Sequence, residues 1–294
     1  MKRLARFTSQ SAFTLIELMI GGAVTSAIGL AVFAFLNAGM LLTAKNLSLN
    51  LTSNQMRGTL DRVEQILQQG DTDPVLIDTA GATVTSGPAA GVKLDRYVGG
   101  PYVVTTTATG LAAGITSVTI TRSTHSMASP SLPLPGDVIR FDSTASTVRP
   151  RVLSASAGNP DGSLRQAVNV TLAAPLSTAV SVASPSVLTA KLVHPVAFIV
   201  MPNGSKNELR FYGSIETTTN LADQTKYIVV TDQIATQAED TTPFSLSTIS
   251  GETFVNFALR VRDDRNANRL RTKQADEYNT FSRVNSYLRP KINP

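Results

Sequence analysis

A long stretch without charged residues dominates the hydropathy pattern near the start of the chain. From Leu18 to Leu42 there are 25 consecutive uncharged residues, most of them Leu, Ile, Met, Ala, Val or Phe. At about 1.5 Å of rise per residue, a helix of this length crosses the roughly 30 Å hydrocarbon core of a bilayer. Lys2, Arg3 and Arg6 precede the stretch, and positive residues keep the adjoining end in the cytoplasm. The pattern therefore predicts a single membrane span, with the rest of the chain exported.

The helical pattern continues beyond the apolar stretch as an amphipathic stripe. Apolar residues recur mostly three or four positions apart, which places them on one helix face: Leu49, Met56, Leu60, Val63 and Leu67. No proline interrupts residues 13–69, and Gly70 followed by Pro74 supplies a helix stop. We therefore expect one helix over residues 13–70, apolar at 18–42 and packed on a folded domain in its second half.

After residue 74 the pattern changes to short runs typical of β-strands. Six runs rich in β-branched residues are separated by Gly, Pro, Asn and Ser: Val92–Val98, Tyr102–Thr107, Ile115–Thr121, Val138–Phe141, Arg151–Leu153 and Ala167–Leu172. Short strands at such spacing predict a small β-barrel or sandwich. Residues 178–185, rich in Ser, Thr and Ala, predict a loop.

Longer strands are expected from residue 188 onward. The runs that predict them are Leu188–Met201, Glu208–Tyr212, Tyr227–Val230 with Ile234 following, and Phe254–Val261. Asn203-Gly204, between the first two runs, is a strong hairpin signal. The Asn-Gly signal predicts that the first two of these strands form a hairpin.

Residues that carry catalytic or metal chemistry are sparse. The chain has no Cys, and its two histidines, His125 and His194, lie far apart in the sequence. Neither histidine has the spacing of a metal site, and the nucleophile and phosphate-loop motifs are absent. Asp71 and Asp73 lack the spaced oxygen ligands of a calcium loop, so we expect them to serve the helix end. The sequence therefore predicts a chain that is not an enzyme and needs no cofactor.

The charge balance gives little support to nucleic-acid binding. The formal net charge is +5, but without the three basic residues before position 13 the balance is 23 basic to 21 acidic residues. The tail from Arg260 to Lys291 is basic and contains interleaved aromatic residues, a pattern that can bind single strands. Phe281, Val284 and Leu288 also recur at helical spacing, and we favour apolar anchoring of this tail over a nucleic-acid partner.

The residues at the start of the apolar helix form a specific motif. A small residue, Ala12, precedes Phe13, and Glu17 follows at the edge of the apolar stretch. This arrangement resembles the type IV pilin and pseudopilin family, although the family usually has Gly where Ala12 stands. The resemblance implies that residues 1–12 are a leader, that a prepilin peptidase cuts between Ala12 and Phe13, and that the new amine of Phe13 is methylated. It also implies that Glu17 pairs with the methylated amine of a neighbouring subunit during assembly. The alternative is a signal anchor or a secretory signal peptide in which Glu17 occurs by chance, held at the membrane interface without a role in assembly.

The C-terminal strands resemble, more loosely, the minor pilins and pseudopilins called W in pili and J in type II secretion. This resemblance implies a linker and first head strand at 71–92, and a β meander and tail of the pilin head at 191–294. Residues 93–190 have no counterpart in that subfamily, and we expect them to form an inserted β domain. The expected fold class is α+β, with a long N-terminal helix packed on an antiparallel β-sheet head that carries a small β-barrel or sandwich.

The resemblance implies a structural function. We expect a minor pilin or pseudopilin that is held in the inner membrane with its head in the periplasm. It would then enter a type IV pilus-like or type II secretion filament at or near the tip. The implied partners are other pilin or pseudopilin subunits, the prepilin peptidase and, before assembly, inner-membrane lipid. The alternative is an adhesin or DNA-binding tip module on the same stem.

Overall fold

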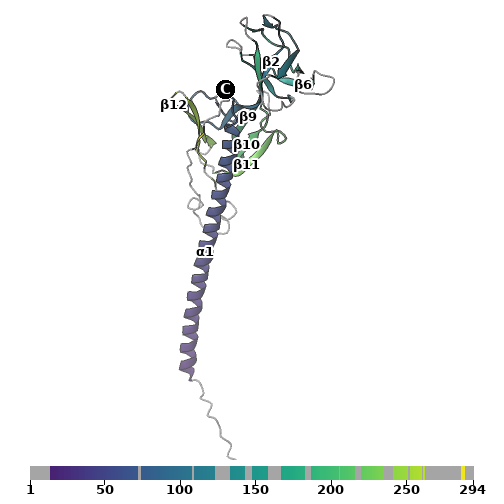
Figure 1. Cartoon of the computed structure of the whole chain (residues 1–294). Helices are drawn as coiled ribbons and strands as arrows, with labels where there is room; N and C mark the ends of the chain where they lie inside the picture. The colour runs from purple at the N-terminus through teal and green to yellow at the C-terminus, as the bar shows by residue number, and fades with distance from the viewer. Residues whose placement is uncertain are drawn as a thin grey trace, which may run out of the picture. The chain divides into compact units, whose positions relative to one another are not determined.

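A computed structural model of the chain confirms the long N-terminal helix (Figure 1). The structure describes residues 14–71, 74–107, 109–122, 133–142, 148–157, 167–182, 187–204, 206–215, 220–234, 241–250, 252–259, 261 and 286–288. Helix α1 (Leu15–Leu67) is 53 residues long and is long and apolar enough to span a membrane. It ends close to the expected stop, where the Gly70 amide donates to the Leu67 carbonyl.

Two compact units divide the chain, and their boundary falls within α1. The first comprises Met1–Leu51 and Asp263–Tyr278, and the second comprises Thr52–Arg262 and Asn279–Pro294. All the described strands belong to the second unit, which is called the head below. The C-terminal part of α1, from Thr52, therefore belongs to the head rather than to a separate stem.

The largest element of the head is an antiparallel sheet of nine strands. Its path runs β11-β10-β9-β2-β4-β7-β6, with β1 paired to β2 and β5 paired to β9. The strands are β1 (Val75–Ile77), β2 (Gly91–Val104), β4 (Ser117–Arg122), β5 (Val138–Phe141), β6 (Val152–Ala157), β7 (Ala167–Leu172), β9 (Thr189–Asn203), β10 (Lys206–Tyr212) and β11 (Tyr227–Ile234). The expected hairpin is present, because Asn203 pairs with Lys206 and Gly204 has a φ of 61°, which favours glycine.

One end of this sheet is curled around its own core. Val138 bridges to Arg151, and the Ile139 amide donates to the Pro150 carbonyl, so β5 meets the segment that leads into β6. The side chains enclosed by the curl are apolar and buried, and they include Tyr102, Ile120, Ile139, Phe141, Val152, Val170 and Leu192. Along these short strands apolar and polar residues alternate, which places one face inward.

The other end of the sheet packs against α1. Met56, Val63 and Leu67 of the helix join a core that includes Val92, Leu94, Val196, Phe198, Leu209 and Phe211 from β2, β9 and β10. A second cluster includes Ile77, Ala197, Ile199, Tyr212 and Ile215. Because successive side chains of a strand point to opposite faces, these two clusters lie on opposite faces of the sheet. Helix α1 covers the first face.

Smaller sheets complete the described part of the head. Strands β12 (Phe244–Ile249), β13 (Glu252–Phe257) and β14 (Ser286–Leu288) form one, and β3 (Gly110–Leu111) pairs with β8 (Val180–Ser181). The sequence analysis missed β12 and β3, and it predicted a loop where β8 lies. Leu288, in the basic tail, pairs with Val255 as part of β14.

Strand β2 corrects the prediction of two separate strands, Val92–Val98 and Tyr102–Thr107. Register shifts occur between Tyr97 and Gly99 and between Gly99 and Tyr102, so the glycines and proline there produce irregular pairing with β9 rather than a turn. Strands β2 and β9 therefore run continuously from the helix-covered core to the curled core. The expected inserted domain at 93–190 stays a prediction, and its two ends lie within these strands.

Candidate functional site

The first candidate site is the beginning of α1, where Thr14 and Glu17 form a reciprocal cap. The Thr14 amide and hydroxyl donate to Glu17 Oε2 at 3.0 and 3.1 Å, and the Glu17 amide donates to Thr14 Oγ1 at 3.2 Å. This is a capping box, which satisfies amides that have no partner within the helix. Glu17 therefore has a local role in the helix start, in addition to the assembly role that the family resemblance implies.

The cleavage residues lie outside the described part of the chain. Ala12 and Phe13 precede the first described residue, Thr14. Cleavage between them, methylation of Phe13 and pairing of Glu17 with a neighbouring amine stay predictions. Of the two histidines, His125 is also outside the described residues, and so is most of the basic tail from Arg260 to Lys291.

The helix surface after Glu17 is suited to an apolar environment. Large apolar side chains are exposed on all sides of this part of α1, and they include Leu18, Met19, Ile20, Ile28, Leu30, Phe33, Phe35 and Met40. The Thr25 hydroxyl donates to the Gly21 carbonyl and the Ser26 hydroxyl to the Gly22 carbonyl, at 2.7 and 2.8 Å. Both hydroxyls therefore have partners within the helix, which lowers the cost of placing them in lipid.

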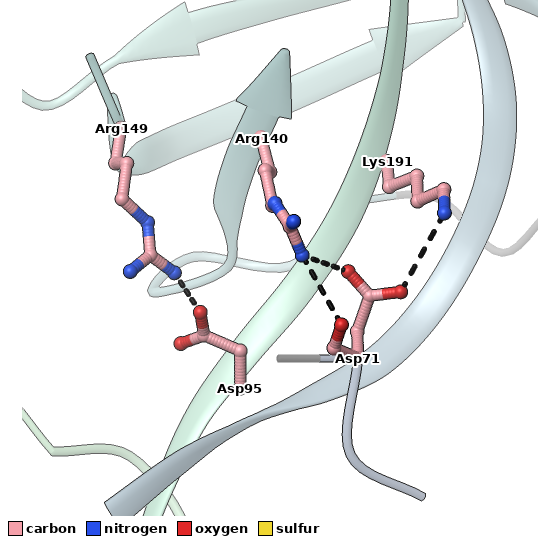
Figure 2. A network of polar contacts seen from close by, with 5 residues as sticks. All are labelled: Asp71, Asp95, Arg140, Arg149 and Lys191. Atoms are coloured by element: carbon pink, nitrogen blue, oxygen red, sulfur yellow. Dashed lines mark hydrogen bonds and ion pairs between the residues drawn. The ribbon is translucent and has the colours of Figure 1, made fainter. Parts of the chain in front are cut away.

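A second candidate site lies in the head, just after the end of α1. Here Asp71 forms ion pairs with Arg140 and Lys191, and Asp95 forms one with Arg149 (Figure 2). These five residues are called the charge cluster. The Asp71 carboxylate has no exposed surface, and it lies 2.5 Å from Arg140 Nη1 and 3.7 Å from Lys191 Nζ. Figure 2 shows Arg140 and Lys191 reaching this carboxylate from neighbouring strands. The Asp71 carboxylate therefore links the residue after the end of α1 to two strands of the sheet.

Backbone pairing fixes the position of Asp71 next to β2. The Asp71 amide donates to the Asp95 carbonyl at 2.8 Å, and the Tyr97 amide donates to the Gln69 carbonyl at 2.9 Å. The residues that follow α1 are thus held along the edge of β2, where Gly70 pairs with Arg96, the residue after Asp95. Arg149 donates to the Asp95 carboxylate. Asp71 thus links Arg140 of β5 to the end of the helix, and Asp95 links Arg149 to β2.

His194 and Tyr97 lie on β9 and β2, the strands that also contain Lys191 and Asp95 of the charge cluster. His194 Nδ1 lies 2.5 Å from Asp137 Oδ1, so this histidine has a buried carboxylate partner. The Tyr97 hydroxyl donates to the Gly100 carbonyl at 2.6 Å. Burial raises the pKa of Tyr97, and the nearby charge of Asp71 raises it further. Among the described residues, no group of three His, Cys, Asp or Glu side chains is placed to hold a metal ion.

Lys93 adds a further positive charge beside the charge cluster. Burial lowers the pKa of its ammonium, and the positive charges of Arg149 and Arg151 lower it further. Among the residues that the structure describes, no carboxylate is paired with Lys93. The sequence analysis missed these cations because they come from distant segments. The available signal was the presence of charged residues, such as Lys93, Arg140 and Lys191, inside otherwise apolar strands.

Comparisons of the chain with protein-family models, with curated proteins and with solved structures returned no match. The architecture itself is pilin-like, because a long apolar N-terminal helix is followed by an antiparallel β-sheet domain.

Proposed function

We propose that the chain is a minor pilin or pseudopilin, a structural subunit that enters a filament through its N-terminal helix. The observation that carries the proposal is the continuity of α1. One uninterrupted helix begins as an exposed apolar rod capable of spanning a membrane and ends, at Val63 and Leu67, in the core of the β head. A helix built in this way can move from lipid into an equally apolar filament core while its head remains folded.

The proposed role requires partners rather than a reaction. A neighbouring subunit would cover the apolar surface of α1 and supply the amine for Glu17, and a prepilin peptidase would create that amine at Phe13. Before assembly the subunit would be held in the inner membrane, with its head in the periplasm. We infer no enzymatic activity and no cofactor.

The experiment that tests the proposal follows processing. The full chain is expressed with and without a prepilin peptidase, purified from membranes and analysed by intact mass and N-terminal sequencing. With the peptidase, we expect the mature protein to begin at Phe13 and to carry a methyl group on its amine. Without it, residues 1–12 should remain. A mature protein that begins at another residue, or identical masses in the two strains, would overturn the assignment.

A further inference from the structure

Lys93 lies on the face of the head sheet that α1 does not cover. Its neighbours in β2, Val92 and Leu94, point into the core that contains Val63 and Leu67 of the helix. Side chains alternate along a strand, so Lys93 points to the opposite face. There it is paired across the sheet with Ala197, which belongs to the core on that face.

The environment of Lys93 is positively charged and only partly hydrated. Its side chain is half-buried, and Arg149 and Arg151 are close enough to lower its pKa beyond the effect of burial. Asp95, two residues further along β2, lies on the same face as Lys93. Its carboxylate is engaged by Arg149, and the Asp71 carboxylate is engaged by Arg140 and Lys191. No carboxylate of the described residues therefore neutralises Lys93.

Arg149 is bonded to the carboxylate of Asp95, two residues from Lys93 along β2. A half-buried ammonium near a guanidinium group is unfavourable in the folded chain, because burial and like charge both oppose the charged form. Groups held in such positions often have a binding function, since the cost is recovered when an oppositely charged ligand arrives. Arg149 can contribute to such binding. Its side chain is 45% exposed, and only one of its terminal nitrogens is bonded to Asp95. Its remaining N–H groups and the three of Lys93 are donors suited to carboxylate or phosphate oxygens.

We propose that Lys93, together with Arg149 and Arg151, forms a binding site for an oxyanion, either a carboxylate or a phosphate group, on the face of the head away from α1. None of these residues belongs to the exposed part of α1. Carboxylates already fit the cations of this region, as the Asp95–Arg149 pair shows. An acidic side chain of a partner and a free anion would present the same group to Lys93.

The test measures the thermal stability of the full chain, purified in detergent, with increasing inorganic phosphate or glutarate at constant ionic strength. A ligand that binds only the folded state raises the melting temperature, and at about ten times its Kd the expected rise is roughly 3–6 °C. We expect a saturable rise for the wild type with at least one of the two anions. The anion that gives the rise identifies the preferred group.

Variants separate this site from general salt effects. Lys93→Met should melt at a higher temperature than the wild type without anion, because it removes an unpaired charge, and it should lose the response to anion. Lys93→Gln should lose the response as well, whereas Lys226→Met, which changes an exposed lysine, should keep it. Absence of a response in the wild type with both anions, or an equal response in Lys93→Met, would overturn the proposal.

Discussion

The Asp71 carboxylate and the Arg140 guanidinium lie 2.5 Å apart, and they join the end of α1 to β5 of the curled sheet. Asp71 is completely buried, while the Arg140 side chain keeps 39% of its surface exposed. Lys191 of β9 lies near the second carboxylate oxygen, which has no hydrogen-bond partner among the described residues. The buried carboxylate at the end of α1 is thus bound by cations of two strands, β5 and β9, that also contribute to the curled core.

We expect Asp71→Asn to destabilise the head by about 2 kcal/mol. Removing one partner of a buried ion pair can cost roughly 3–5 kcal/mol, but the exposure of Arg140 allows water to replace part of the interaction. Urea unfolding followed by circular dichroism measures the change. Arg140→Gln should cost less, and the double variant should show a coupling energy of at least about 0.5 kcal/mol. Strictly additive effects would show that the two residues do not interact energetically.

Packing of the helix end is expected to contribute more than the charges do. Leu67 is completely buried in the core between α1 and the sheet, so Leu67→Ala should lower the free energy of unfolding by about 3 kcal/mol. Ile228 on β11 is 55% exposed, and Ile228→Ala should change the free energy of unfolding by less than about 0.5 kcal/mol. The same urea experiment compares them. Similar losses in both variants would argue against a helix end that is integral to the head.

The lowered pKa of Lys93 predicts a pH dependence with a definite sign. Between the lowered pKa of Lys93 in the folded chain and the ordinary lysine value of 10.5, the unfolded chain binds more protons than the folded chain. The free energy of unfolding should therefore rise with pH there and fall as pH decreases. Burial raises the pKa of Tyr97 and Tyr212, and their effect is opposite, a loss of stability above about pH 10.

Comparison of variants isolates the contribution of Lys93. Between about pH 8 and pH 10, Lys93→Met should show a flatter rise of the urea midpoint than the wild type, because it has no ammonium to deprotonate. Lys226→Met should follow the wild type. An identical slope in the wild type and in Lys93→Met would show that the lysine titrates alike in the folded and unfolded chain.

Local patterns predicted α1 and most of the strands because each depends on neighbouring residues. The stripe at Met56, Val63 and Leu67 is buried as its spacing indicated, and the Asn203-Gly204 signal marks the hairpin between β9 and β10. The patterns failed where pairing partners decide the structure. Strand β12, for example, is specified by its ladder with β13 and by the stacking of Phe244 on Phe257, and neither is visible in a short window of sequence.

The charge cluster could not be predicted for the same reason. Asp71 and Lys191 are 120 positions apart in the sequence. They meet because β2 pairs with β9 and the residues after α1 lie along β2. A single sequence contains no signal for such long-range contacts. The capping box at Thr14 and Glu17 could have been recognised, since Thr followed by Glu three residues later is its signature. The family motif drew attention to the same glutamate for a different reason.

The two possible roles of Glu17, cap and assembly contact, can be separated by matched variants. Glu17→Gln removes the charge but keeps an acceptor, since Gln also serves at this position of a capping box. Thr14→Ala removes the hydroxyl that accepts from the Glu17 amide but keeps the carboxylate. If Glu17 pairs with a neighbouring amine in the filament, Glu17→Gln should lower incorporation by two orders of magnitude or more, because an unpaired buried charge costs roughly 3–5 kcal/mol.

The measurement is the ratio of this subunit in sheared filaments to that in the membrane, together with the N-terminus of the mature protein. Membrane insertion and cleavage before Phe13 should be nearly unchanged in both variants, because the apolar stretch and the basic residues before it direct them. Thr14→Ala weakens only the helix start, by about 1 kcal/mol, so its ratio should stay much closer to that of the wild type. If instead Thr14→Ala lowered the ratio and Glu17→Gln did not, the carboxylate would act through the helix cap alone, and its pairing with a neighbouring subunit would have to be abandoned.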